Sequence, residues 1–165
     1  MGYACKKGLK PESPNQDDFF IAAVDRVCGL YGVFDGHGPY GHDISGFVHQ
    51  HLPEKILKSE NLAAHPMETL KKAFLETHKK CAKAGDKGRF DATLSGTTAT
   101  VVMVKEEEQV LYVAHVGDSR AVAAKQVQRD DEILLEVEDL TVDHKPSNPE
   151  EKVSIEQLFY CMIVF

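Results

Sequence analysis

Two strand-like segments carry apolar residues on both of their alternating faces. Residues 99–104 (Ala-Thr-Val-Val-Met-Val) and 110–116 (Val-Leu-Tyr-Val-Ala-His-Val) are separated by a short charged turn. Such strands are stable only when both faces of their sheet are covered. The two segments therefore predict an α+β fold, in which an antiparallel sheet has helices on one face and a second sheet on the other.

Four other segments read as strands of the same kind. Residues 19–24 and 30–34 are apolar, rich in aromatic or β-branched side chains, and separated by the polar break at Asp25 and Arg26. We expect these two to pair with each other. Residues 121–126 and 133–137 follow the segment at 110–116 after short turns, which predicts an antiparallel meander.

Two helices are predicted between these groups of strands. Apolar side chains recur at helical spacing over residues 44–52, and Pro53 is expected to break or restart that helix. A second helix is predicted over residues 66–83, with Pro66 suited to its first turn. Gly85 and Gly88 are expected to end it.

The composition excludes several classes of function. With 19 basic and 26 acidic residues among 165, the formal net charge is −7, so nucleic acid is not an expected partner. No apolar run reaches the roughly 18 residues that a spanning helix needs, and the N-terminus lacks the order of a signal peptide. We expect one domain that avoids membranes, in the cytoplasm or, as an alternative, in the nucleus.

Aspartates stand where three of the predicted strands begin or end. Asp35 closes the strand at 30–34, and Gly36 after it permits a sharp turn that presents a carboxylate and a carbonyl oxygen together. Asp17 precedes the neighbouring strand, and Asp118 follows the strand at 110–116. Hard oxygen ligands favour Mg²⁺ or Mn²⁺. Each acid alone is an ordinary turn residue, but their coincidence at strand ends predicts a metal site.

Histidines and cysteines give no comparable signal for zinc. The four cysteines are widely spaced without a Cys-x-x-Cys pair, and His37 with His42 lacks further ligands. His115 lies inside an apolar strand and is expected to be a structural residue with its hydrogen bonds satisfied. His37, beside the predicted metal site, is a candidate general acid.

A dinucleotide-binding loop is the main alternative for the same residues. Gly36, Gly38 and Gly41 form the pattern G-x-G-x-x-G after a strand and before a helix. That function requires a parallel βαβ unit, whereas the later strands are joined by turns too short for crossovers. Pro39 also removes one backbone donor from the loop.

Five motifs in this chain resemble successive motifs of the metal-dependent, type 2C serine/threonine protein phosphatases. They occur in the family's order and cover roughly residues 3–152. The motifs are Pro14-Asn-Gln-Asp-Asp-Phe19, Tyr31-Gly-Val-Phe-Asp-Gly-His-Gly38, Ser95-Gly-Thr-Thr-Ala99, Val113-Ala-His-Val-Gly-Asp-Ser-Arg-Ala121 and Leu140-Thr-Val-Asp-His-Lys-Pro146.

The resemblance implies an α-β-β-α sandwich with antiparallel sheets and a centre of two Mg²⁺ or Mn²⁺ ions. Phosphoserine and phosphothreonine proteins are the implied substrates, dephosphorylated by metal-activated water. Asp35 matches the acid that bridges the two metals, and the Gly36 carbonyl matches a ligand of one of them. His37 matches the general acid, Asp17 an acid that holds metal-bound water, and Asp118 an acid tied to a third metal.

Several positions depart from the family pattern. Gln16 stands where relatives often have Glu, and Glu12 stands where many have a phosphate-binding arginine. Lys6, Lys7 or Lys10 are the candidate substitutes for that arginine, and we select Lys10. A lysine binds phosphate only as a point charge.

The family's later aspartates do not occur in this chain. We expect residues 1–152 to form the N-terminal part of the domain and residues 153–165 to form a divergent apolar tail, which is a candidate for self-association. With two carboxylates missing, metal binding and activity should be weak. A non-catalytic relative that acts as a binding or regulatory module is the second hypothesis.

Overall fold

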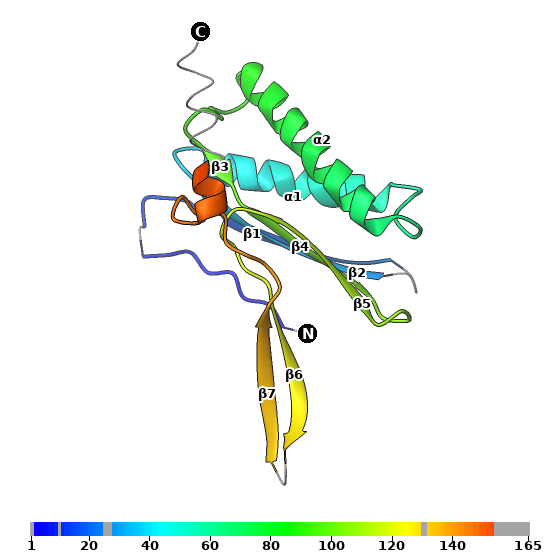
Figure 1. Cartoon of the computed structure of the whole chain (residues 1–165). Helices are drawn as coiled ribbons and strands as arrows, with labels where there is room; N and C mark the ends of the chain where they lie inside the picture. The colour runs from blue at the N-terminus through cyan, green and yellow to red at the C-terminus, as the bar shows by residue number, and fades with distance from the viewer. Residues whose placement is uncertain (1, 10, 25–27, 130–131, 154–165) are drawn as a thin grey trace.

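A five-stranded antiparallel sheet forms the centre of the protein (Figure 1). The computed structural model describes residues 2–9, 11–24, 28–129 and 132–153. The strand order is β1-β2-β4-β5, and the short β3 pairs with β2. The strands are β1 (Asp17–Val24), β2 (Cys28–His37), β3 (Gly96–Thr97), β4 (Ala99–Lys105) and β5 (Val110–Val116).

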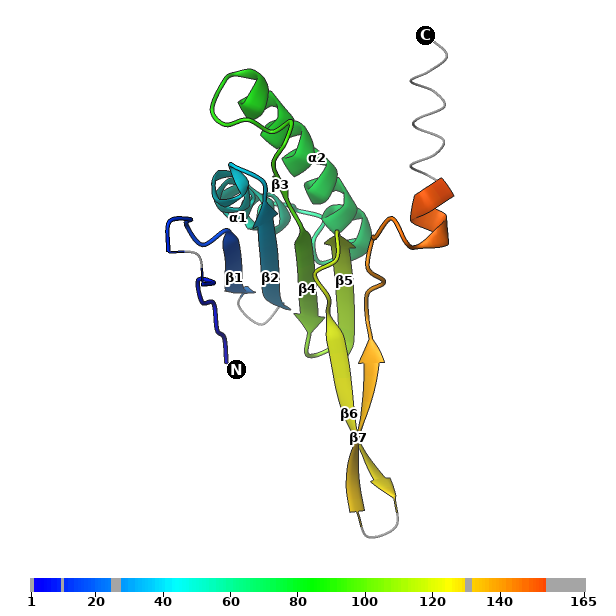
Figure 2. The ribbon, with the colours of Figure 1, turned by 90° about the vertical axis from the view of Figure 1, so that its left-hand side faces the viewer.

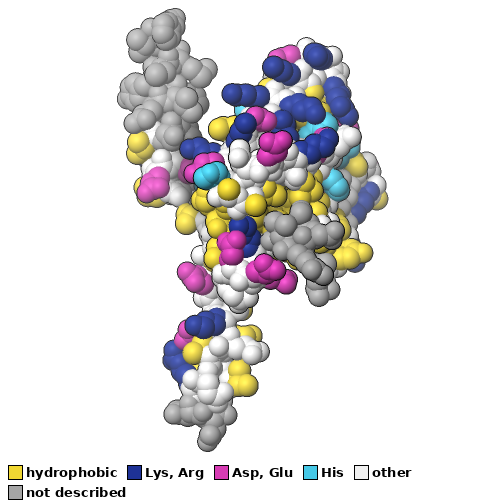
Figure 3. Space-filling view, turned by 90° about the vertical axis from the view of Figure 1, so that its right-hand side faces the viewer, with side chains coloured by type: hydrophobic (Ala, Val, Ile, Leu, Met, Phe, Trp, Pro, Cys, Tyr) yellow, Lys and Arg dark blue, Asp and Glu magenta, His cyan; other side chains and the backbone are white. Residues whose placement is uncertain are grey.

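Both helices, α1 (Gly41–Leu57) and α2 (Pro66–Asp86), cover one face of this sheet (Figures 1 and 2). The core lies between the two layers, where Leu30 and Val101 of the sheet are fully buried with Ile56 of α1. Lys and Arg side chains gather on the outer surface of the helical layer (Figure 3). The predicted α+β class, with antiparallel strands and helices on one face, is confirmed. Neither α1 nor α2 is apolar enough to cross a bilayer, and the described residues contain no other helix that is.

Helix α1 continues through Pro53, contrary to the predicted break. Proline has no N–H, so the turn at Pro53 lacks the hydrogen bond to the carbonyl of His49, at a typical cost of about 3 kcal/mol. Leu52 and Ile56, on either side of it, are buried against the sheet. Their packing offsets the lost bond, because tertiary contacts routinely override helix propensity.

Helix α2 ends as the glycines predict, but slightly later. It passes through Gly85 and ends at Asp86. Gly88 has a φ of +74°, and its N–H donates to the Gly85 carbonyl at 2.8 Å. The N–H of Arg89 donates to the Ala84 carbonyl at 3.0 Å. This pair of bonds is a Schellman motif, which needs a left-handed residue at Gly88 and only an ordinary helical one at Gly85.

The last two strands, β6 (Val122–Arg129) and β7 (Glu132–Asp139), do not extend the main sheet. They form a separate two-stranded sheet that projects beyond it (Figures 1 and 2). The predicted meander is therefore wrong after β5. In the hairpin Ala124 lies opposite Val137 on an apolar face, while Lys125 lies opposite Glu136 on a charged face.

The face of the main sheet opposite the helices is only partly covered by the described residues. Ile21, Val33 and Leu111 remain between 40% and 47% exposed. Figure 3 shows hydrophobic side chains over the sheet between the helical layer and the hairpin. The second covering layer that the sequence predicts is thus limited here to the two-stranded sheet. The predicted apolar tail at 153–165 lies, except for residue 153, outside the described residues.

The buried hydroxyl of Thr77 on α2 leads to a prediction about stability. Thr77 is buried, and its Oγ1 has no hydrogen-bond partner among the described residues. Replacing Thr77 with Val keeps the shape and removes the unpaired polar group. We expect Thr77→Val to raise the free energy of unfolding by about 1 kcal/mol, measured by urea denaturation.

Thr69 provides the matched control, because it is equally buried on α2 but its hydroxyl lies 3.4 Å from the Ser59 hydroxyl. Thr69→Val should lower stability. A Thr77→Val protein that is less stable than the Thr69→Val protein would contradict the assignment.

Candidate metal centre

Asp17 and Asp35 are direct neighbours across the β1–β2 pair. The register places Asp17 opposite Asp35, so both side chains leave the sheet on the same side. The two carboxyl groups are close enough to share a hydrogen bond. Partial burial raises the pKa of Asp35, and the negative charges of Asp17 and Asp118 raise it further. Two neighbouring carboxylates repel each other, and a proton or a bound cation relieves that repulsion.

Asp118 lies in the turn between β5 and β6 and faces the same site. Its charge acts on Asp35, and its own carboxylate is 3.6 Å from the Lys145 ammonium. Asp17 and Asp118, which the sequence places at the ends of two other strands, are thus both close enough to Asp35 for their charges to act on it. His37, the last residue of β2, lies opposite Gly96 of β3 and is close enough for its charge to lower the pKa of Asp35.

The backbone at Gly36 is confined on both sides. A Cβ atom at this position would lie 2.5 Å from the carbonyl oxygens of both Gln16 and Gly41. The Gly36 N–H donates to the Gln16 carbonyl at 3.1 Å, and the Gln16 side-chain amide donates to the Gly38 carbonyl at 2.8 Å. Gln16 therefore holds the loop from the N-terminal side. From the sequence we considered only the negative charge that Gln16 lacks. The ability of its side-chain amide to donate a hydrogen bond was the signal that would have predicted this contact.

A divalent cation fits this donor set in part. The acids and the Gly36 carbonyl offer hard oxygen atoms, and a cation would relieve the repulsion between Asp17 and Asp35. Within the part of the chain that the structure describes, no three Asp, Glu, His or Cys side chains converge closely enough to form a metal site by themselves. Water would have to complete the coordination, as is common for Mg²⁺.

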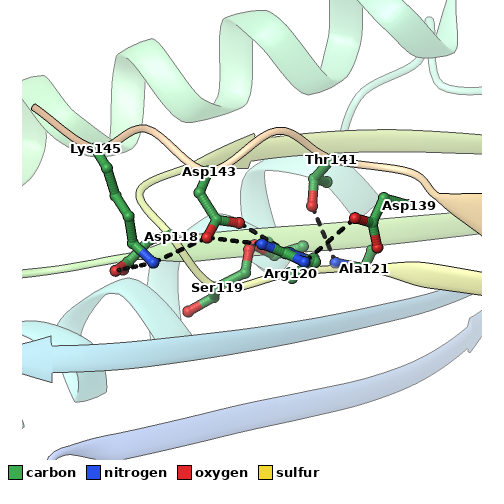
Figure 4. A network of polar contacts seen from close by, with 9 residues as sticks. Asp118, Ser119, Arg120, Ala121, Asp139, Thr141, Asp143 and Lys145 are labelled. Carbon is green, nitrogen blue, oxygen red and sulfur yellow. Dashed lines mark hydrogen bonds and ion pairs between the residues drawn. The ribbon is translucent and has the colours of Figure 1, made fainter. Parts of the chain in front are cut away.

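A network of charged side chains anchors the segment after β7 to the turn that carries Asp118 (Figure 4). Arg120 donates two hydrogen bonds to Asp143, each 3.0 Å long, and one to Asp139 at 3.2 Å. Lys145 contacts Asp143 at 2.9 Å as well as Asp118. Arg120 and Lys145 together hold the pKa of Asp143 well below its usual range. This network was not predicted from the sequence. Its signal was the pairing of opposite charges two residues apart, Asp118 with Arg120 and Asp143 with Lys145.

His115 departs from its predicted role as a satisfied residue. Its ring packs on His144 with 4.5 Å between centroids, but its buried Nδ1 has no hydrogen-bond partner among the described residues. Burial, and then the charge of His144, lower the pKa of His115. The His144 ring instead accepts a bond from the Gly117 N–H at 3.3 Å.

A cavity of about 620 Å³ opens between the N-terminal segment and the loop after β2. Of the three acids, Asp17 lines it, together with Gly36 and Gly38 of the loop and Lys7 of the N-terminal segment. Lys10, which we selected as the phosphate-binding residue, lies outside the described residues. Among the alternative lysines, Lys7 is the one that borders this cavity.

The glycine loop does not belong to a dinucleotide-binding fold. All strand pairs among the described residues are antiparallel, so β2 and α1 are not part of a parallel βαβ unit. The interpretation of Gly36, Gly38 and Gly41 as a cofactor loop is therefore wrong. These glycines serve a strand-to-helix turn instead, through the positive φ of Gly38 and the close backbone contacts of Gly36 and Gly41.

Comparison with known sequences identifies relatives. The family model described as Protein phosphatase 2C matches residues 13–160. A probable protein phosphatase 2C 35 of Arabidopsis thaliana is 36% identical over 88% of this chain and 41% of its own length. Protein phosphatase 2C 1 of Paramecium tetraurelia is 35% identical over 78% of this chain and 42% of its own length. The chain thus spans less than half the length of these curated relatives.

Solved structures with a similar fold lead to the same group. A PPM Ser-Thr phosphatase of Mycobacterium smegmatis is 30% identical, with a TM-score of 0.55 over 86% of this chain and 52% of that one. A sex determining protein of C. elegans matches in fold, with 22% identity and a TM-score of 0.69 over 88% of this chain and 35% of that one. The sequence match and the fold lead to one conclusion: the chain belongs to the protein phosphatase 2C family.

Proposed function

We propose that this chain forms part of the catalytic site of a metal-dependent phosphatase that acts on phosphoserine and phosphothreonine in proteins. The observation that carries the proposal is the Asp17–Asp35 pair, in which two carboxylates lie opposite each other and Asp17 borders a cavity. Such a pair costs stability unless a cation neutralises it. Membership of the phosphatase 2C family supports a phosphoprotein as the substrate.

Two Mg²⁺ or Mn²⁺ ions are the proposed cofactors of the complete site. When bound, such ions supply an activated water and polarise the phosphoryl group. Asp35 and the Gly36 carbonyl are the proposed direct ligands, because Asp35 is the acid on which the other charges converge. Asp17 orients water beside it, and Asp118 is the proposed contact to a further metal ion.

His37 is the proposed proton donor to the leaving serine or threonine oxygen. It is exposed at the end of β2, next to the acid pair, and an imidazole exchanges protons near neutral pH. Lys7 is the proposed contact to the substrate phosphate, since it borders the same cavity as Asp17. Its ammonium donates to the Pro11 carbonyl at 2.7 Å, which keeps it near the opening.

The first test of this function is Asp35→Asn. The change keeps the size of the side chain and removes the charge that holds the cation. We expect Mn²⁺-dependent hydrolysis of a phosphothreonine peptide to fall by about a hundredfold or more, since metal catalysis contributes several kcal/mol. Asp86→Asn, at the exposed end of α2, should leave the rate unchanged.

Absence of hydrolysis by the unaltered chain at any Mn²⁺ concentration would refute the proposal for this chain. Calorimetry with the same peptide would then show whether the chain is a phosphoprotein-binding module.

Lys7→Ala tests the phosphate contact separately. Loss of one exposed charge near the phosphate should raise KM for the peptide by about fivefold and leave kcat almost unchanged. Lys83→Ala removes an equal charge from α2, outside the residues that line the cavity, and serves as the control. An equal effect of both substitutions on KM would indicate that Lys7 acts only through net charge.

A further inference from the structure

Thr98, between β3 and β4, makes an unusual contact with the backbone of Asp35. Its N–H donates to the Asp35 carbonyl at 2.9 Å, as expected of residues opposite each other in an antiparallel ladder. The Asp35 N–H, however, donates to the Thr98 side-chain oxygen at 2.9 Å rather than to its carbonyl. The Thr98 carbonyl instead accepts from the Thr97 hydroxyl. The Thr98 side chain thus replaces a backbone acceptor in the ladder opposite Asp35, the central acid of the candidate site.

The same hydroxyl reaches the turn that carries Asp118. Thr98 Oγ1 lies 2.6 Å from Ser119 Oγ. Since the Thr98 oxygen already accepts from the Asp35 N–H, its own proton is available to the serine. Thr98 is buried and Ser119 is half-buried, so the contact between the two hydroxyls is partly shielded from water. One side chain therefore bonds to the backbone of Asp35 and to the neighbour of Asp118.

Two further contacts hold the turn against β4. The Thr100 hydroxyl, also buried, donates to the Ser119 carbonyl at 2.7 Å. Gly117 has a φ of +98°, and a Cβ there would lie 2.6 Å from the methyl group of Thr98. The turn before Asp118 is therefore packed directly on Thr98, and its position follows that of the threonine.

We propose that Thr98 is a positioning residue that fixes Asp35 relative to Asp118 through the Asp35–Thr98–Ser119 chain of hydrogen bonds. The proposal rests on the proposed function, because it assigns both acids to one metal site. Thr98 touches neither metal nor substrate. Its hydroxyl connects the end of β2 to the turn after β5 by hydrogen bonds. These two segments are otherwise separated by β4.

Amide hydrogen exchange measured by NMR tests this coupling without any metal. Thr98→Val keeps the side-chain shape and should speed exchange of the Asp35 amide and of amides 117–121 by about tenfold. Ser119→Ala should speed exchange of the distant Asp35 amide by about threefold. Thr98→Ser, which keeps the hydroxyl, should restore the slow rates. Thr77→Val, a buried threonine change on α2, is the control and should affect neither segment.

The proposal requires that a change at either end of this chain of hydrogen bonds affect the other end. If Ser119→Ala leaves the Asp35 amide unchanged, or Thr98→Val leaves amides 117–121 unchanged, the coupling is absent. A melting temperature for each variant establishes that it is folded, and Ser119→Ala with the Asp35 amide as readout decides the coupling if Thr98→Val does not fold. Thr100→Val should speed exchange of amides 117–121 and leave the Asp35 amide unchanged, because its hydroxyl bonds to the Ser119 carbonyl and not to Asp35; an equal effect on the Asp35 amide would show that the path does not run through Thr98.

Mn²⁺ titration by calorimetry separates this inference from the proposed function. Thr98→Val should weaken Mn²⁺ binding by about three- to tenfold, with recovery in Thr98→Ser. Equal binding by the unaltered and Thr98→Val proteins would overturn the positioning role and leave the phosphatase proposal intact. No Mn²⁺ binding by the unaltered chain would refute the metal site, while the exchange data would still decide the coupling.

Discussion

The register of β1 against β2 is the constraint on which the candidate site depends. A shift of one residue would move Asp17 to the opposite face of the sheet and separate it from Asp35. Phe20 fixes the register, because its ring occupies the space over Gly32, where a Cβ would lie 2.1 Å from the ring. The same ring stacks on Phe34 at 5.8 Å between centroids. Hydrophobic packing within the core thus supports two carboxylates that repel each other at the rim.

Around this pair, polar contacts of three kinds hold the loops in place. The Gln16 amide restrains the turn after β2, the Thr98 hydroxyl connects that strand to the turn after β5, and the Arg120–Asp143 pair ties in the segment after β7. Each contact joins segments that are distant in sequence. The acids remain accessible to solvent. Of the three contacts that hold them, the one made by the buried Thr98 hydroxyl is the best shielded from water, where hydrogen bonds are stronger, whereas the Arg120 side chain is about half exposed.

Much of the architecture and the gathering of the acids follows from local pattern. The polar break at 25–26 between two apolar runs predicts the β1–β2 pair, and that pair brings Asp17 to Asp35. Local pattern fails where a tertiary contact decides the outcome. Burial of Leu52 and Ile56 allows α1 to continue through Pro53. The Thr98 hydroxyl accepts the hydrogen bond from the Asp35 N–H that a backbone carbonyl would normally accept. A sequence shows that such groups can donate or accept, but their partners emerge only from the fold.

The core on the helical side of the sheet is complete within residues 20–103, whereas the opposite face is partly open. Its members come from consecutive strands and helices, so their contacts are formed early in the order of synthesis. It follows that this layer is able to assemble on the ribosome before later residues emerge, in the manner of units that fold from the N-terminus first. The exposed face of the sheet would then already be formed when β6 and β7 emerge.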